Sequence, residues 1–315
     1  MSAFLKVAQL KTVDALRRRL SELGVDLPVD DRIETAEEGS PLAAPLKLGP
    51  LEAGNRWCIH PMEGWDAELD GSPSVHTLRR WKRFGQSGAK LIWGGEAAAV
   101  QPDGRANPHQ TLAVPENLAG LKALRETLVA AHCEKFGSVD DLVIGLQLTH
   151  SGRFCRPNSK KLEPRIAYHH PLLDPKFGID PLDDSVVWTD RQLEELVERY
   201  IDAARVARDA GFHFVDVKAC HGYLLHEFLS ARTRPGAYGG AFDSRARLLL
   251  TIIGEIQRQI PRLSIGVRLS VFDMPPFEAR DGVGQPTPFD HLLPYQFGFG
   301  LEPSQPLTQD LSEPI

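Results

Sequence analysis

The feature that most constrains the fold is an alternation of short apolar segments with amphipathic segments between residues 56 and 270. The apolar segments have the length and composition of buried strands, and they are residues 56–61, 89–94, 141–150, 212–218 and 264–270. The segments between them carry apolar residues at helical spacing, and they are residues 76–88, 115–135, 189–210 and 244–259. Strand–helix alternation predicts an α/β fold with a parallel sheet and right-handed crossovers.

The lengths of the connections favour a barrel of alternating strands and helices. The longest connection follows the strand at residues 141–150 and runs to residue 188, whereas the turns from helix to strand are short. Elaboration of one end of a sheet is typical of a (β/α)8 barrel whose site lies at the carboxyl ends of the strands. A doubly wound open sheet is the alternative, but no G-x-G-x-x-G fingerprint follows any strand.

Composition and charge exclude several classes of protein. The formal net charge of −6 leaves no basic footprint, so nucleic acid is not an expected partner. No apolar run approaches the roughly 18 residues that span a bilayer, and charged residues interrupt any signal-peptide core in residues 1–20. The four cysteines are far apart and form no C-x-x-C pair, which argues against a disulfide framework or a structural zinc site. We therefore expect a cytoplasmic protein without a metal site.

Residues 215–230 change from a buried strand to a helix or turn, and they place three polar side chains close together. Lys218, His221 and Tyr223 lie within six residues at this changeover. An amine, an imidazole and a phenol can all donate hydrogen bonds, so together they could hold one substrate oxygen. In a barrel, this end of the strand is where the chemistry takes place.

Six ordered motifs resemble those of the old yellow enzyme family, the NADH:flavin oxidoreductases. They are His60-Pro61-Met62, Gly95-Glu96-Ala97 with Asp103-Gly104-Arg105, residues 147–153, residues 221–230, residues 238–247 and residues 266–270. The resemblance runs from about residue 46 to residue 315. It implies an FMN-binding (β/α)8 barrel that passes hydride from NAD(P)H through FMN to an electron-poor acceptor such as an α,β-unsaturated carbonyl.

The resemblance assigns five residues to the flavin. Gln147 is implied at the pyrimidine edge, where its amide offers both a donor and an acceptor. Arg268, which we expect to be buried, is implied near the N1–O2 edge, where a positive charge stabilises reduced flavin. Pro61, Met62 and Ala97 would contact the ring. The alternatives are a strand-capping role for Gln147 and a structural ion pair between Arg268 and a strand-end carboxylate.

Two residues depart from the family pattern. Glu63 is counted with the flavin-binding residues, but it stands where the family commonly has a hydroxyl or thiol, and an ionised carboxylate there would disfavour reduced flavin. Lys218 stands where the family has histidine. With His221 it would hold the acceptor's oxygen, and its charge would select acidic or strongly polarised substrates. Tyr223 matches the family's proton donor.

Lys218 also supports other interpretations. It could form a salt bridge with Asp216 or Glu227. It could be the Schiff-base nucleophile of a class I aldolase-like lyase, with Tyr223 moving protons. That lyase hypothesis does not account for Gln147 or the motif series. A non-catalytic barrel fragment is the third possibility.

The ends of the chain lead to a prediction of an incomplete barrel. We expect residues 1–48 to form an amphipathic helix, at residues 2–23, and a connecting arm, and residues 49–315 to form a partial FMN-binding barrel. About five of the eight βα units of such a barrel can be counted, and residues 310–315 resemble a helix start with Ser312 as cap. In the family, the loops that hold the FMN phosphate belong to strands that come after this point of the sequence. We therefore expect a fragment of a longer reading frame, or a chain completed by a C-terminal segment or by another copy, rather than a self-sufficient enzyme.

Overall fold

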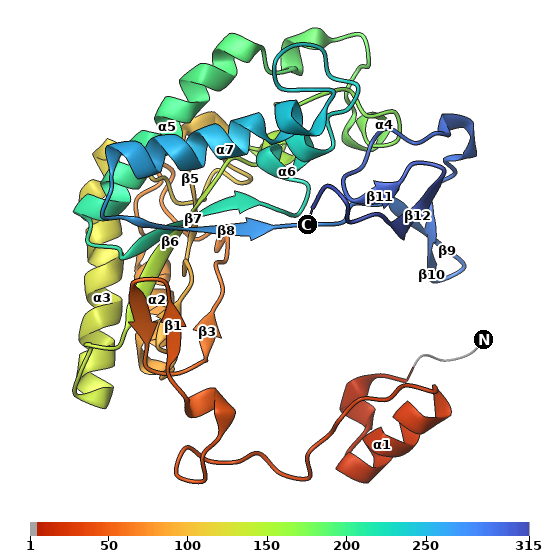
Figure 1. Cartoon of the computed structure of the whole chain (residues 1–315). Helices are drawn as coiled ribbons and strands as arrows, with labels where there is room; N and C mark the ends of the chain where they lie inside the picture. The colour runs from red at the N-terminus through yellow and green to blue at the C-terminus, as the bar shows by residue number, and fades with distance from the viewer. Residues whose placement is uncertain (1–4, 315) are drawn as a thin grey trace.

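A computed structural model describes residues 5–314 and has a parallel β-sheet at its centre (Figure 1). The sheet has the order β3-β4-β6-β7-β8, with β5 also beside β6. Its strands are β3 (Cys58–Ile59), β4 (Leu91–Ile92), β5 (Ala97–Ala99), β6 (Val143–Thr149), β7 (Phe214–Ala219) and β8 (Ser264–Leu269). All pairs in this sheet are parallel, which confirms the predicted α/β class and all five predicted strand segments. Within residues 5–314 the sheet does not close into a barrel.

Helices follow the strands and cover one face of the sheet (Figure 1). The α-helices are α1 (Val13–Glu22), α2 (Val75–Gln86), α3 (Leu118–Phe136), α4 (Asp174–Phe177), α5 (Asp190–Asp209), α6 (Leu224–Leu229) and α7 (Phe242–Gln259). Short 3-10 helices occur at Val7–Gln9, Pro41–Ala43, Pro102–Gly104, Pro115–Asn117, Gly152–Phe154, Asp184–Val186 and Asp290–Leu292. The four helices predicted between strands are confirmed to within a few residues as α2, α3, α5 and α7. None of the helices in residues 5–314 is both long and apolar enough to cross a membrane.

Side chains alternate between the two faces of the sheet, and this alternation separates the core from the site. On β6, Ile144, Leu146 and Leu148 pack in the main apolar cluster with the helices. Val143, on the opposite face, packs near the amino end of the strand with a hairpin made of β1 (Leu46–Leu48) and β2 (Leu51–Ala53). The hairpin covers the amino end of this face. The polar residues of the same face lie farther along the strands, toward their carboxyl ends.

The two ends of the chain differ from the predictions. The helix predicted at residues 2–23 is confirmed only at Val13–Glu22, and residues 1–4 lie outside the described residues. The helix start predicted at residues 310–315 is wrong, because residues 312–314 form a turn; Ile315 lies outside the described residues. Glu313 in that turn accepts hydrogen bonds from Arg232 at 2.9 Å and Arg245 at 2.6 Å, so the turn is tied to the body of the protein.

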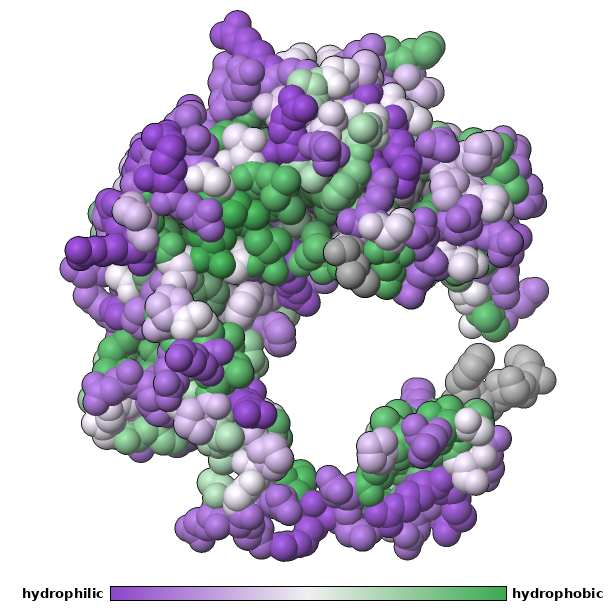
Figure 2. All heavy atoms as spheres, viewed as in Figure 1, coloured by the Kyte–Doolittle hydropathy of each residue, from purple (hydrophilic) through white to green (hydrophobic). Residues whose placement is uncertain are grey.

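After β8 the chain forms two antiparallel hairpins that the sequence did not predict. They are β9 (Phe277–Arg280) with β10 (Val283–Pro286), and β11 (Leu301–Glu302) with β12 (Gln305–Gln309). Neither hairpin pairs with the central sheet. The outer edge of β8 therefore has no neighbouring strand among residues 5–314, and none of the strand's residues is fully buried. Figure 2 shows apolar surface over this region of α7 and β8.

Candidate active site

The carboxyl ends of the strands surround a pocket of about 480 Å³. Its lining residues come from the segments after β3 and β7 and from β5, β6, β7 and β8; they are His60, Pro61, Met62, Glu63, Ala97, Gln147, Lys218, His221, Tyr223 and Arg268. All nine residues that the sequence singled out therefore lie around one pocket. His60 is the additional lining residue, and the signal for it was its place in the His-Pro-Met motif.

Gln147 lies on β6 in the lining of the pocket and is almost fully buried. Its Nε2 donates a hydrogen bond to Asp216 Oδ2 at 2.6 Å. Asp216, on β7, has no exposed surface, and its pKa is raised because burial outweighs the stabilising hydrogen bond from Gln147. The contact fixes the orientation of the Gln147 amide, whose Oε1 has no hydrogen-bond partner among the described residues. This role of Asp216 was not predicted, although a carboxylate between Val215 and Val217 needs a partner.

Arg268 lies on β8 directly beside Lys218, its register partner on β7. The prediction that Arg268 is buried is wrong, because β8 is the edge strand and the residue is only half-buried. Within residues 5–314 no carboxylate lies within 4.0 Å of the Arg268 guanidinium, so the expected alternative, a structural ion pair, is not formed there. The guanidinium is therefore available to a ligand in the pocket.

Glu63, Lys218 and Tyr223 form a hydrogen-bonded cluster on one wall of the pocket. Lys218 Nζ donates to Glu63 Oε1 at 2.7 Å, and the Tyr223 hydroxyl donates to Glu63 Oε2 at 2.7 Å. Lys218 Nζ also lies 3.6 Å from the centroid of the Tyr223 ring, which is a cation–π contact. Lys218 thus forms a salt bridge, but neither partner expected for it is correct: it pairs with Glu63, and not with Asp216 or Glu227. Its partner is the other residue that departs from the family pattern.

The environment of Tyr223 and His221 changes how readily each takes up or releases a proton. Burial raises the pKa of the Tyr223 phenol, and the Glu63 carboxylate raises it further. Partial burial lowers the pKa of His221, and the charges of Arg268 and Lys218 add to this effect. His221 also has a left-handed backbone, with φ of 61°, a conformation that is costly for a residue with a Cβ and that is enriched at functional sites. Near neutral pH the phenol therefore keeps its proton and the imidazole is mainly neutral.

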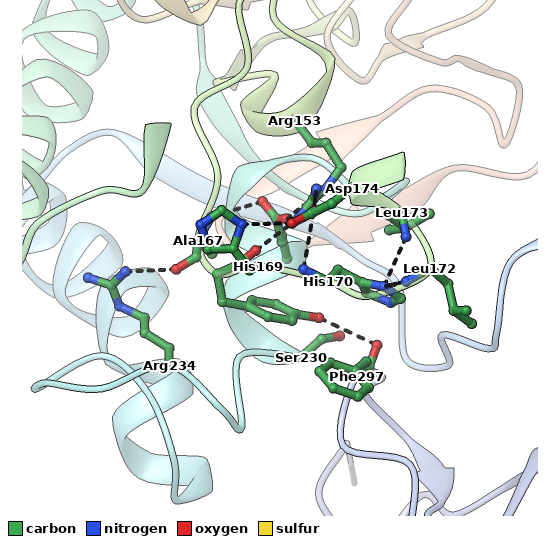
Figure 3. Close-up of polar contacts among 12 residues, drawn as sticks. Arg153, Ala167, His169, His170, Leu172, Leu173, Asp174, Ser230, Arg234 and Phe297 are labelled. Carbon is green, nitrogen blue, oxygen red and sulfur yellow. Dashed lines mark hydrogen bonds and ion pairs between the residues drawn. The ribbon is translucent and has the colours of Figure 1, made fainter. Parts of the chain in front are cut away.

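A buried charge network positions the segment that carries Tyr223 (Figure 3). Arg153, just after β6, donates to Glu227 Oε1 from Nε at 3.0 Å and from Nη2 at 2.6 Å. It also contacts Asp174 and donates to the carbonyl of Tyr168 at 2.9 Å. Since Glu227 belongs to α6 and Tyr223 is the N-cap of that helix, the network fixes Tyr223 relative to the loop after β6.

Comparison with known proteins identifies the family. The sequence profile of the NADH:flavin oxidoreductase / NADH oxidase family matches residues 41–279, which is more than half of the chain. The chain belongs to this family. A NADH:flavin oxidoreductase of Gibberella zeae is 32% identical over 75% of this chain and 58% of its own length. An NADPH dehydrogenase of Bacillus subtilis is 30% identical over 74% of this chain and 64% of its own length. This NADH:flavin oxidoreductase family member thus spans roughly 60% of the length of these relatives.

Solved structures of the family share the fold. The old yellow enzyme homologue from Zymomonas mobilis is 26% identical, with a TM-score of 0.59 over 73% of this chain and 63% of that one. The old yellow enzyme from Pichia sp. AKU4542 is 24% identical, with a TM-score of 0.57 over 74% of this chain and 60% of that one. The NADH:flavin oxidoreductase family assignment therefore agrees with the parallel sheet and its carboxyl-end pocket.

Proposed function

We propose that this chain is an FMN-dependent oxidoreductase that passes hydride from NAD(P)H to an electron-poor acceptor such as an α,β-unsaturated carbonyl. The observation that carries the proposal is the single pocket around which all nine sequence-selected residues lie. Relatives support it: besides the NADPH dehydrogenase of Bacillus subtilis, a putative 12-oxophytodienoate reductase 2 of Oryza sativa is 26% identical over 76% of this chain.

Five residues of the pocket lining fit an FMN ring. Gln147 presents an amide oxygen without a partner among the described residues, held in place by the bond from its nitrogen to Asp216. Arg268 presents a guanidinium suited to a carbonyl or an anionic edge. Pro61 and Ala97 are buried apolar surface, and Met62 is an exposed apolar side chain beside them. When bound, FMN would supply the hydride-carrying ring, and these residues would orient it.

Three other residues of the pocket lining would bind the acceptor. We assign Lys218 and His221 to the acceptor's oxygen, since both can donate hydrogen bonds there. We assign Tyr223 as the proton donor, and its raised pKa keeps the phenol protonated across the physiological range. The carboxylate of Glu63 is not a lone negative charge beside the ring, because Lys218 balances it at 2.7 Å.

The lyase alternative is less well supported. A Schiff-base lysine attacks through the lone pair of a neutral amine. Lys218 Nζ instead donates a hydrogen bond to Glu63 in an ion pair, and an ammonium nitrogen has no lone pair for attack. Borohydride trapping in the presence of a carbonyl substrate tests this directly. A covalent adduct on Lys218 would replace the flavin proposal with the lyase one.

The cofactor proposal predicts that the chain binds FMN and that Arg268→Met binds it about tenfold more weakly or worse. Hydrogen bonds to a charged group contribute about 1.5–3 kcal/mol, and about 1.4 kcal/mol corresponds to tenfold in affinity. FMN fluorescence quenching and the flavin absorbance of the purified protein measure the binding. The matched control is Arg262→Met, because Arg262 is an exposed arginine just before the same strand. Equal affinity in both variants, or no binding by the unaltered chain, contradicts the cofactor proposal.

We also infer that the outer edge of β8 receives a further parallel strand, from a complementing segment or from a second copy. Two features support this inference. The strand's outer backbone has no pairing partner within residues 5–314, and a cavity of about 500 Å³ beside it is lined partly by Trp93, Phe214 and Ile265. Unpaired edges next to apolar surface are usually covered in native proteins. Sedimentation of the purified chain would separate self-association from a monomer that needs another segment.

A further inference from the structure

The carboxylate of Glu63 lies between two groups that the proposed function assigns to the acceptor. One oxygen accepts from Lys218 Nζ and the other from the Tyr223 hydroxyl, each at 2.7 Å. Both carboxylate oxygens are therefore used. The position that faces the amine and the phenol together is filled by a side chain of the protein itself, so an acceptor must bind beside that side chain.

The cluster is formed by parts of the fold that are distant in the chain and in the sheet. Glu63 follows β3, whereas Lys218 lies on β7, and β4 and β6 separate these two strands in the sheet. The contact therefore crosses the pocket. The side chains of Lys218 and Glu63 are only 6% and 10% exposed. A pair buried to this degree holds together firmly, because separating it leaves a charge without a partner in a poorly solvated place.

The charges around the cluster decide which ligands the pocket can accept. Glu63 neutralises Lys218, so the amine does not act as an unpaired cation. Arg268 is the other cation of the pocket lining; it lies beside Lys218 on the neighbouring strand, and the proposed function assigns it to FMN. An acceptor that carried a carboxylate to Lys218 would meet the Glu63 carboxylate at close range, which is unfavourable. A neutral carbonyl meets no such repulsion, and it can use another of the three N–H donors of the ammonium group.

We propose that Glu63 is a specificity-determining residue that makes the pocket reject anionic acceptors and admit neutral ones. This inference rests on the proposed function, because it takes the acceptor to bind beside Lys218 and Tyr223. It reverses the expectation from sequence that Lys218 selects acidic substrates. The two departures from the family pattern then act as one unit, in which the lysine supplies a donor and the glutamate removes its net charge.

The first test compares benzoate with benzamide, which have similar shape but differ in charge, as ligands of the unaltered chain and of Glu63→Gln. Binding is measured by NMR with FMN present and, in the Arg268→Met background, without FMN, so that Arg268 does not itself bind benzoate. We expect the unaltered chain to bind benzamide more tightly than benzoate. In Glu63→Gln the unpaired Lys218 should improve benzoate binding by about tenfold or more, as removal of a like charge and release of a cation predict. The double variant Glu63→Gln with Lys218→Met should lose that gain.

Two outcomes would overturn the proposal: a preference of the unaltered chain for benzoate, or equal benzoate binding by the unaltered chain and Glu63→Gln. With FMN present, the first comparison needs no variant, so it stands even where a variant folds poorly. Because ligand binding is read directly and not through turnover, a chain that fails to bind FMN but prefers benzamide refutes the cofactor and not the role of Glu63. A chain that binds FMN but shows no preference between benzamide and benzoate refutes the role of Glu63 and not the cofactor.

The second test reads the Tyr223–Glu63 contact through ionisation of the phenol. The ultraviolet absorbance of phenolate is titrated with pH in the unaltered chain and in Tyr223→Phe, and the difference reports Tyr223. In Glu63→Gln the midpoint should fall by about one pH unit or more, since the carboxylate that opposes ionisation is gone while Lys218 remains over the ring. An unchanged midpoint would show that Glu63 does not hold the phenol and would refute the proposed cluster.

Discussion

Replacing Arg153 by methionine should lower the free energy of unfolding by about 3–5 kcal/mol, the range measured when one partner of a buried ion pair is removed. Arg153 is 1% exposed and contacts two carboxylates, Glu227 and Asp174, which are also buried. Methionine fills most of the same volume, but it leaves both carboxylates without their main partner in a region that water does not reach. Urea denaturation followed by tryptophan fluorescence measures the loss.

The control for this prediction is Arg191→Met on the surface of α5. Arg191 also contacts a carboxylate, Glu195, at 3.3 Å, but the two side chains are 87% and 62% exposed. Exposed pairs of this kind contribute about 0.3–0.5 kcal/mol, so this variant should be nearly as stable as the unaltered chain. If Arg153→Met were as mild as Arg191→Met, the network in Figure 3 would not be what holds α6 against the loop after β6.

Much of the fold follows from the sequence because its strands and helices differ sharply in pattern. The strand at residues 143–149 is mostly apolar and buried throughout, and α5 has a capping box between Thr189 and Gln192. β5 was missed because Ala97–Ala99 has no β-branched or aromatic residue, and only its pairing with β6 makes it a strand. The hairpins after β8 were missed for a similar reason, since exposed strands such as Val283–Pro286 lack an apolar face.

The composition of the pocket could be predicted, but the contacts inside it could not. Parallel strands bring their carboxyl ends to one edge, so motifs that follow different strands had to meet there. Which side chains then touch depends on how the sheet curves. Glu63 and Lys218 are 155 positions apart, and each alone looked like an unexplained charge. Their contact requires the segment after β3 to reach across to β7, and no periodicity in the sequence encodes that approach.

Tyr223→Phe should reduce the rate of acceptor reduction by about a hundredfold or more, since a positioned general acid typically contributes 10²–10⁴-fold. The change removes only the hydroxyl. The ring can keep its packing against Phe154, at 5.5 Å between centroids, and its contact with Lys218. Acceptor-dependent oxidation of NADPH measures the rate. Because burial and Glu63 raise the pKa of this phenol, the unaltered chain should not lose rate through ionisation of Tyr223 up to about pH 9.

The matched control is Tyr295→Phe, which removes a buried hydroxyl outside the pocket, 3.3 Å from His170 Nε2. It should leave the rate unchanged although it removes a hydrogen bond.

The decisive comparison is between Tyr223→Phe and Glu63→Gln. If Tyr223 delivers the proton, its hydroxyl must turn from Glu63 to the acceptor, so loss of the hydroxyl should slow the reaction much more than loss of the carboxylate does. If Tyr223→Phe keeps its rate while Glu63→Gln loses it, the carboxyl group and not the phenol supplies the proton, and the assignment of Tyr223 is wrong.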